Sequence, residues 1–193
     1  LKFNSDDDEI IGNINVKPFF LSSTINISRI NLKKIFKENS ILVNILKSEI
    51  LNNKNLNGKL AIKTNNFESL NFLKEIKFDI LLEEGDIFIQ NLETIFKNSV
   101  IINISDTQLI VDNYKLSFAG YISLDFKDIT EFYTHYQINR NFRKNIKKIN
   151  FGFLLNLDDQ FLEIDNLKVN GKINQNLEKF LKEFNSNKEN IFN

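Results

Sequence analysis

The sequence contains no cysteine, no methionine and no tryptophan, and it has only one histidine and one proline. Without cysteine the chain has no thiol nucleophile, and it can build neither a disulfide scaffold nor a zinc site on thiolates. Its 25 Lys and Arg residues balance its 25 Asp and Glu residues, whereas a dedicated nucleic-acid-binding protein usually carries a basic excess. We therefore expect no nucleic acid among its partners. No apolar run approaches the ~18 residues that a membrane-spanning helix requires.

Recognisable catalytic motifs are also missing. The chain has no Gly-x-Ser-x-Gly elbow, no Gly-rich phosphate loop and no His-Glu-x-x-His pair. Its one imidazole, His135, lies in an aromatic segment without a neighbouring nucleophile or acid, so we interpret it as a surface or interface residue. The acidic run from Asp6 to Glu9 lacks the alternating ligands and the glycine of a calcium loop. We expect no enzymatic activity, no cofactor and no metal site.

The chain does contain many segments in which apolar and polar residues alternate, a pattern typical of strands with one apolar face. Short polar turns separate several of them, among them Glu84–Asp86, Asp112–Asn113 and Asp158–Asp159. The expected strands cover residues 10–16, 20–28, 58–64, 75–83, 86–96, 99–111, 114–125, 147–157 and 161–169. The predicted fold class is mainly β (α+β), with a long curved antiparallel sheet that has an apolar face, plus a few short helices.

Four segments have helical spacing instead. Each begins after a residue that commonly caps a helix N-terminus, namely Asn31, Ser40, Asp128 and Asn176. The acidic segment 1–9 is interpreted as solvated and prone to disorder, and residues 186–193 as a frayed tail.

The long strands must cover their apolar faces with a second sheet, with the helices or with an apolar ligand. Eight residues are the candidates for this apolar face: Phe78, Ile80, Ile102, Leu116, Phe118, Ile122, Phe151 and Phe153. A lipid-lined groove and a closed core have the same alternation, so the pattern leaves both open.

A basic cluster follows the third helical segment. Arg140, Arg143, Lys144, Lys147 and Lys148 would form one cationic stripe on a helix. Such a stripe could meet anionic headgroups or an anionic partner. The alternative is a solvated face that nearby carboxylates balance.

The order of these parts resembles a known family. The segments LNNKNLNGKLAIK (51–63), GYISLDFKDITEFYTHYQINRNFRKNIKKINFGF (120–153) and LEIDNLKVNGKINQNLEKFL (162–181) together resemble the C-terminal region of bacterial AsmA-like envelope proteins. The resemblance extends over residues 40–185 and depends on the sequence of parts, because no short invariant motif is present. AsmA-like proteins are related to the TamB and YhdP types, which consist of repeating β-groove units.

The resemblance implies a non-enzymatic segment, either one domain over 1–193 or a fragment of a larger protein. It implies an apolar β-groove for phospholipid handling or outer-membrane biogenesis, with phospholipid, membrane or envelope proteins as partners. It also implies a location at the bacterial inner membrane and periplasm, with the anchor outside this fragment. The alternative function is a structural or protein-interaction β module with a closed core.

Overall fold

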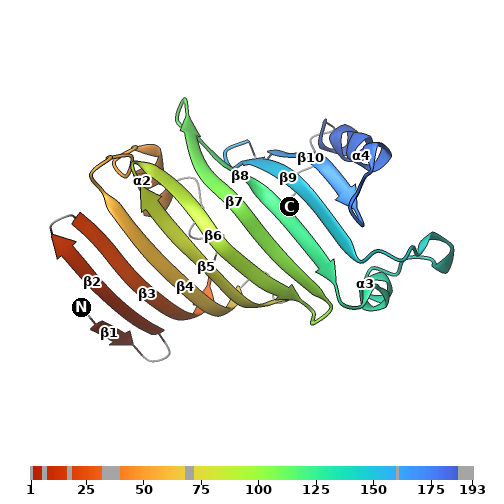
Figure 1. Cartoon of the computed structure of the whole chain (residues 1–193), viewed down its shortest axis with the longest axis horizontal. Coiled ribbons are helices and arrows are strands. Elements are labelled where there is room, and N and C mark those ends of the chain that lie inside the picture. Colours follow the sequence, from red (N-terminus) through yellow and green to blue (C-terminus); the bar gives the residue numbers. More distant parts are fainter. Residues whose placement is uncertain are drawn as a thin grey trace.

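The computed structural model describes residues 2–5, 8–16, 19–31, 40–67, 72–159 and 161–186. They form one 11-stranded sheet in which the strands lie side by side in chain order (Figure 1). The strands are β1 (Lys2–Ser5), β2 (Asp8–Val16), β3 (Phe19–Ile30), β4 (Asn57–Phe67), β5 (Leu73–Glu83), β6 (Asp86–Phe96), β7 (Val100–Asp112), β8 (Lys115–Phe126), β9 (Lys148–Asn156), β10 (Phe161–Val169) and β11 (Lys172–Ile173). The described sheet is open, because β1 and β11 are its two edges and do not pair with each other.

This architecture confirms the predicted mainly β class. All nine expected strands are present, and their ends differ from the prediction by no more than three residues. The polar turns join antiparallel neighbours as expected, since Glu83 lies opposite Asp86 and Asp112 opposite Lys115. Alternation predicted the strands well because most of them have apolar side chains on one face only.

One pair of neighbours, β3 and β4, is parallel, whereas the predicted sheet was antiparallel. The chain between these strands contains helix α2 (Ile41–Lys47). A parallel pair requires a crossover connection of a dozen or more residues, and this connection is long enough although its described helix has only 7 residues. The sheet is therefore mostly, not wholly, antiparallel.

Bulges interrupt four strands, and in β6 the extra residue lies at Asn91, whose φ angle is 53°. The register also shifts in β5, β7 and β10, next to Glu75, Asp106 and Asn166, whose φ angles are 54°, 49° and 50°. A bulge bends its strand and increases the local twist. The bent strands in Figure 1 are consistent with these irregularities.

The other described helices are α3 (Ile129–His135), the short 3₁₀ helix η1 (Arg140–Phe142) and α4 (Gln175–Ser186). Ser40 caps α2 by accepting a 3.2 Å hydrogen bond from the Val43 amide, and Asp128 caps α3 through the Thr130 amide at 2.8 Å. For α4 the side chain that accepts an amide hydrogen bond is Asn174, two residues before the predicted Asn176. The helix predicted after Asn31 lies outside the described residues.

The expectation of disorder in residues 1–9 is wrong for its described part. Lys2–Ser5 forms β1, and Asp8 and Glu9 begin β2, to which β1 is paired. The open edge of β2 explains this difference, because it offers unpaired backbone groups to the preceding segment. The tail from 187 to 193 lies outside the described residues.

Candidate functional site

The sheet has one predominantly apolar face, which we call the apolar face. Residues directly opposite each other on neighbouring strands share a face, so the register can be followed across the sheet. One such row contains Ile10, Ile25, Ile62 and Phe78, and a second contains Leu92, Ile104, Ile122 and Phe151. The same register and alternation place all eight predicted apolar-face candidates on this face. The apolar sides of neighbouring strands therefore do merge into one surface.

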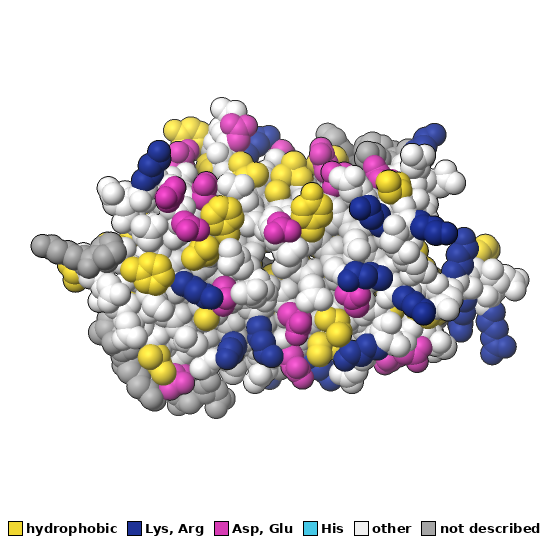
Figure 2. All heavy atoms as spheres, viewed as in Figure 1, with side chains coloured by type: hydrophobic (Ala, Val, Ile, Leu, Met, Phe, Trp, Pro, Cys, Tyr) yellow, Lys and Arg dark blue, Asp and Glu magenta, His cyan; other side chains and the backbone are white. Residues whose placement is uncertain are grey.

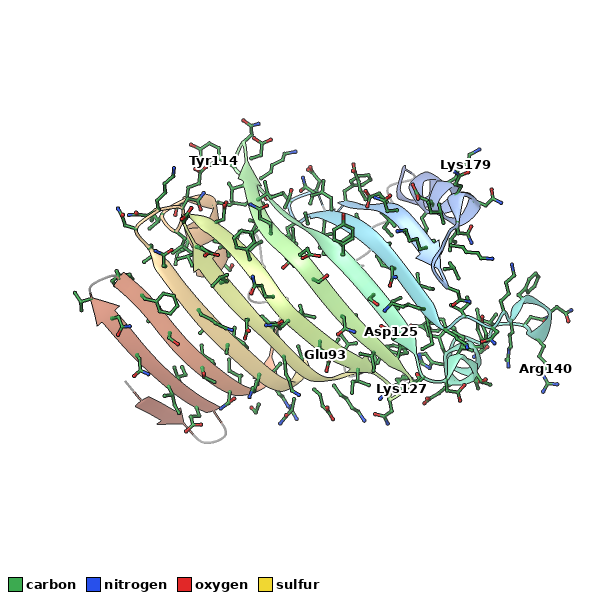
Figure 3. All side chains as sticks on the ribbon, in the orientation of Figure 1. Glu93, Tyr114, Asp125, Lys127, Arg140 and Lys179 are labelled. Atoms are coloured by element: carbon green, nitrogen blue, oxygen red, sulfur yellow. The ribbon has the colours of Figure 1, made fainter. Side chains whose placement is uncertain are left out.

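The opposite face, which Figures 2 and 3 present to the viewer, is predominantly polar. Glu93 and Asp125, labelled in Figure 3, belong to it. Charged pairs cross its strands, such as Lys59 with Asp79 at 2.8 Å and Lys148 with Asp125 at 3.1 Å. A few apolar pairs, such as Leu81 opposite Phe88, are scattered among them. The two faces thus differ in chemistry over most of the sheet.

Helices cover the margins of the apolar face. Leu46 of α2 packs with Ile87 and Leu116, and these side chains are 6%, 6% and 1% exposed. At the other ends of the strands, Phe132 of α3 lies 5.5 Å from Phe126 and 6.2 Å from Phe96, measured between ring centroids. Leu116 is therefore a core residue beneath α2.

A central part of the face is less covered. It comprises Ile102, Ile104, Phe118, Ile122 and Phe151, which come from β7, β8 and β9 and are all partly exposed; we call it the central apolar patch. Phe118 packs edge-on against the buried Phe153, with ring centroids 5.3 Å apart. The remaining candidates, Phe78 and Ile80, border the buried clusters around Ile76 and Leu46.

Two buried polar side chains that interrupt the apolar face are satisfied internally. Thr94 is 3% exposed and donates a 2.9 Å hydrogen bond to the Lys74 carbonyl beside the β5 bulge. Thr107 is 1% exposed and bonds to the backbone of Ile89. Both threonines therefore add little free hydrogen-bonding capacity to the surface.

The N-terminal part of the apolar face was not among the eight predicted candidates. Ile14, Phe19 and Leu21 of β2 and β3 lie on it with exposures of 49%, 39% and 42%. Their alternation had predicted the strands, and the same signal could have placed these residues on the face. Ile11 and Phe20, on the opposite side of the same strands, are also exposed.

The predicted cationic stripe does not form as a helix. Only Arg140–Phe142 is helical, and residues 143–147 form an irregular link to β9. The five basic residues would have formed one stripe only on a helix, and spacing alone does not make a helix where no apolar face has to pack. We call residues 137–147 the basic loop.

The five predicted basic residues have different environments. Lys148 pairs with Asp125, whereas Nε of Arg143 donates to the Ile138 carbonyl at 2.9 Å. Arg140, Lys144 and Lys147 are exposed and form no ion pair with the part of the chain that the structure describes.

Two residues that the sequence analysis missed hold the basic loop in place. The hydroxyl of Tyr133 accepts from the Lys144 amide at 3.0 Å and donates to its carbonyl at 2.6 Å. The side chain of Asn170 accepts from the amides of Lys147 and Lys148, and donates to the Asn145 carbonyl. No sequence signal could have identified these contacts, because they join residues that lie 11 to 25 positions apart.

Charges of opposite sign gather at opposite ends of the strands. The turns after β5, β7 and β9 bring mainly carboxylates to one end, namely Glu83, Glu84, Asp86, Asp112, Asp158 and Asp159. The basic loop, Lys97, Lys127 and Lys172 lie at the other end. In Figure 2 the Lys and Arg side chains are correspondingly frequent towards the right and lower margin. We call these the acidic end and the basic end.

The one histidine lies beside a lysine and an aromatic ring. Nδ1 of His135 lies 2.8 Å from Nζ of Lys97, and its ring packs 6.0 Å from that of Phe96. Within the described ranges no group of three or more His, Asp or Glu residues could hold a metal ion. No described helix is long and apolar enough to span a membrane.

Comparisons with protein-family models, with curated proteins and with solved structures found no match for this chain.

Proposed function

We propose that this chain is a non-enzymatic segment of an AsmA-like bacterial envelope protein, and that its apolar face takes up the acyl chains of phospholipids. The observation that supports this proposal most is the partly exposed central apolar patch on an open sheet. The family resemblance of residues 40–185 points in the same direction. On this proposal the protein works at the inner membrane and periplasm.

The energetics of this proposal depend on the hydrophobic effect. Burying one CH₂ group is worth ~0.8 kcal/mol, so an acyl chain of about fifteen carbons gains on the order of 10 kcal/mol relative to water. Since dispersion and hydrophobic contacts are not directional, a chain could slide along the face without breaking specific bonds. The headgroup would remain in water at an end of the strands.

A closed-core module is the competing proposal, and the exposed side chains of β2 and β3 favour a protein-binding variant of it. Ile11 and Phe20 face one side of these strands while Ile14 and Leu21 face the other, and all four are exposed. Such a two-sided apolar edge is suited to a protein partner in envelope assembly. The described residues contain no second sheet that would close a core over the central apolar patch.

Uptake of fluorescent phospholipid by delipidated protein tests the lipid proposal. We expect saturable uptake that Ile102→Asp and Phe118→Asp reduce at least tenfold, because a buried carboxylate is costly beside an acyl chain. The matched control is Ile110→Asp, which changes the same residue type in the same strand as Ile102 but on the opposite face, where Ile110 is 38% exposed.

Circular dichroism would establish that each variant is folded, and native mass spectrometry of the unmodified protein would detect co-purified lipid independently. Saturable uptake that only the apolar-face variants lose would support the proposal. Absence of saturable uptake by the unmodified protein, or equal loss with Ile110→Asp, would contradict it.

A further inference from the structure

The basic loop presents an exposed aromatic side chain at one extreme of the molecule. Phe142 is 75% exposed at the end of η1, which Figure 1 places beyond α3 and away from the sheet. Arg140, labelled in Figure 3, lies at the same extremity. A single exposed apolar side chain is common on protein surfaces, so the charges around Phe142 have to show whether it serves a contact.

Cations surround this aromatic residue without compensating carboxylates. Arg140, Lys144 and Lys147 form no ion pair with the described residues, and no Asp or Glu occurs in the sequence between Glu131 and Asp158. The chain as a whole is neutral, so this local excess is a property of the loop. Its charge is complementary to an anionic surface.

The loop is also held in one conformation by its own contacts. Tyr133 and Asn170 fix its second half, while the side chain of Asn139 accepts from the Asn141 amide at 3.1 Å at the start of η1. Arg143 closes the tip by bonding to the Ile138 carbonyl. Because the conformation is pre-formed, binding would cost little additional ordering of the backbone.

We propose that the basic loop docks on an anionic phospholipid bilayer, with Phe142 entering the interfacial region and Arg140, Lys144 and Lys147 meeting the lipid phosphates. An aromatic side chain among unpaired cations has the composition of interfacial membrane anchors. A nucleic acid fits less well, because its recognition combines stacking residues with a basic groove that follows the backbone, whereas here one aromatic residue projects from a loop. This proposal does not depend on lipid uptake by the apolar face.

A tryptophan reporter tests this docking directly, because the chain contains no natural tryptophan. The full chain carrying Phe142→Trp is mixed with vesicles of equimolar phosphatidylcholine and phosphatidylglycerol, and with pure phosphatidylcholine vesicles. We expect a blue shift of the tryptophan emission with the anionic vesicles only, which high salt abolishes. The matched reporter is Tyr114→Trp, which replaces an 81% exposed aromatic residue at the acidic end and is expected not to shift.

Vesicle co-sedimentation provides a second measurement. We expect Phe142→Ser to weaken binding to the anionic vesicles about tenfold, and Lys144→Gln about fivefold. Tyr114→Ser and Lys54→Gln are the corresponding controls and should leave binding unchanged, since both positions are exposed and lie at the other end of the strands.

Several results would overturn the proposal. These are equal shifts for the two reporters, no shift for either, and binding that Phe142→Ser leaves intact. A shift of the Phe142→Trp reporter with single-stranded nucleic acid or polyglutamate but not with anionic vesicles would also overturn it, and would assign the loop to a different partner.

Discussion

At the scale of single residues, the carboxylate of Asp158 is largely buried and has two partners. It lies in the turn after β9, where it forms an ion pair with Lys47 of α2 and accepts a 2.7 Å hydrogen bond from the Leu116 amide. Burial by itself would raise the pKa of this carboxyl group, but Lys47 and the Leu116 amide outweigh it and hold the pKa below its ordinary value. The side chains of Lys47 and Asp158 are only 18% and 19% exposed.

The lowered pKa of Asp158 makes part of the stability pH-dependent. A carboxyl group with a lower pKa in the folded than in the unfolded state contributes stability that is present above its unfolded pKa of about 4 and lost as the pH falls through the folded value. We expect Asp158→Asn to reduce the free energy of unfolding by about 1–3 kcal/mol at neutral pH. That difference from the unmodified protein should shrink below about pH 4.

Urea denaturation at a series of pH values measures this effect. The control is Asp159→Asn, because the neighbouring Asp159 pairs with Lys115 at 2.9 Å in an arrangement that is about half exposed. Exposed pairs contribute little, so this variant should differ from the unmodified protein by less than about 1 kcal/mol. Equal losses for both variants, or a loss for Asp158→Asn that persists in acid, would refute the assignment.

At the scale of elements, α2 shows how a short helix is stabilised by tertiary contacts. Seven residues are too few for an independent helix in water, so its packing against the sheet has to hold it. The apolar side of this packing is Leu46, which is 6% exposed in the cluster with Ile87 and Leu116. The adjacent residue in the sequence, Lys47, adds the ion pair with Asp158.

Replacement of Leu46 by alanine should therefore cost about 2–5 kcal/mol of unfolding free energy, because it removes buried methyl groups and leaves a cavity above the sheet. The neighbouring Ile45 is 38% exposed, and Ile45→Ala should cost less than about 1 kcal/mol. Urea unfolding monitored by circular dichroism compares the two. Similar costs for the two variants would show that α2 does not pack through Leu46.

Most strands could be predicted from the sequence, whereas the bulges, the parallel pair and the basic loop could not. The alternation of apolar and polar residues is visible in the sequence because one face of most strands lies among apolar neighbours. The bulges escape detection because Glu75 and Asp106 occupy left-handed conformations that usually call for glycine or asparagine. The basic loop depends on Tyr133 and Asn170, whose partners are distant in sequence.

The candidate site was predictable to a similar extent. All eight nominated apolar residues share one face, but their separation into covered ones such as Leu116 and partly exposed ones such as Phe118 depends on where α2 and α3 pack. That packing is a tertiary property. A strand has the same alternation of apolar and polar residues whether or not a helix covers it.

At the scale of the whole molecule, the strands form a row in which each pairs only with its neighbours in the chain. Stability in such an arrangement need not be uniform. β8 has strands on both sides, and α2 and α3 cover its two ends through Leu116 and Phe126. By contrast, the described β1 pairs only with Asp8–Ile11, so the register leaves Asn13–Val16 of β2 without a described strand on that side.

Amide hydrogen exchange should follow this gradient. We expect the slowest exchange in β7 and β8 and exchange at least a hundredfold faster in β1 and in Asn13–Val16, because opening the edge exposes little additional apolar surface. Val16, for example, is already 74% exposed. Exchange measured by mass spectrometry on peptides from both regions provides the test, and uniform protection across the sheet would contradict a graded stability.

The separation of the acidic end from the basic end gives a neutral molecule an electric dipole moment along its strands. A strand of about eleven residues is roughly 35 Å long, several times the Debye length of about 8 Å at physiological ionic strength. A charged surface within about one Debye length of the protein therefore senses mainly the end nearest to it, and a net charge of zero does not make the protein electrostatically inert. Near a negatively charged surface the resulting torque would turn the basic end inward, so orientation would precede adhesion.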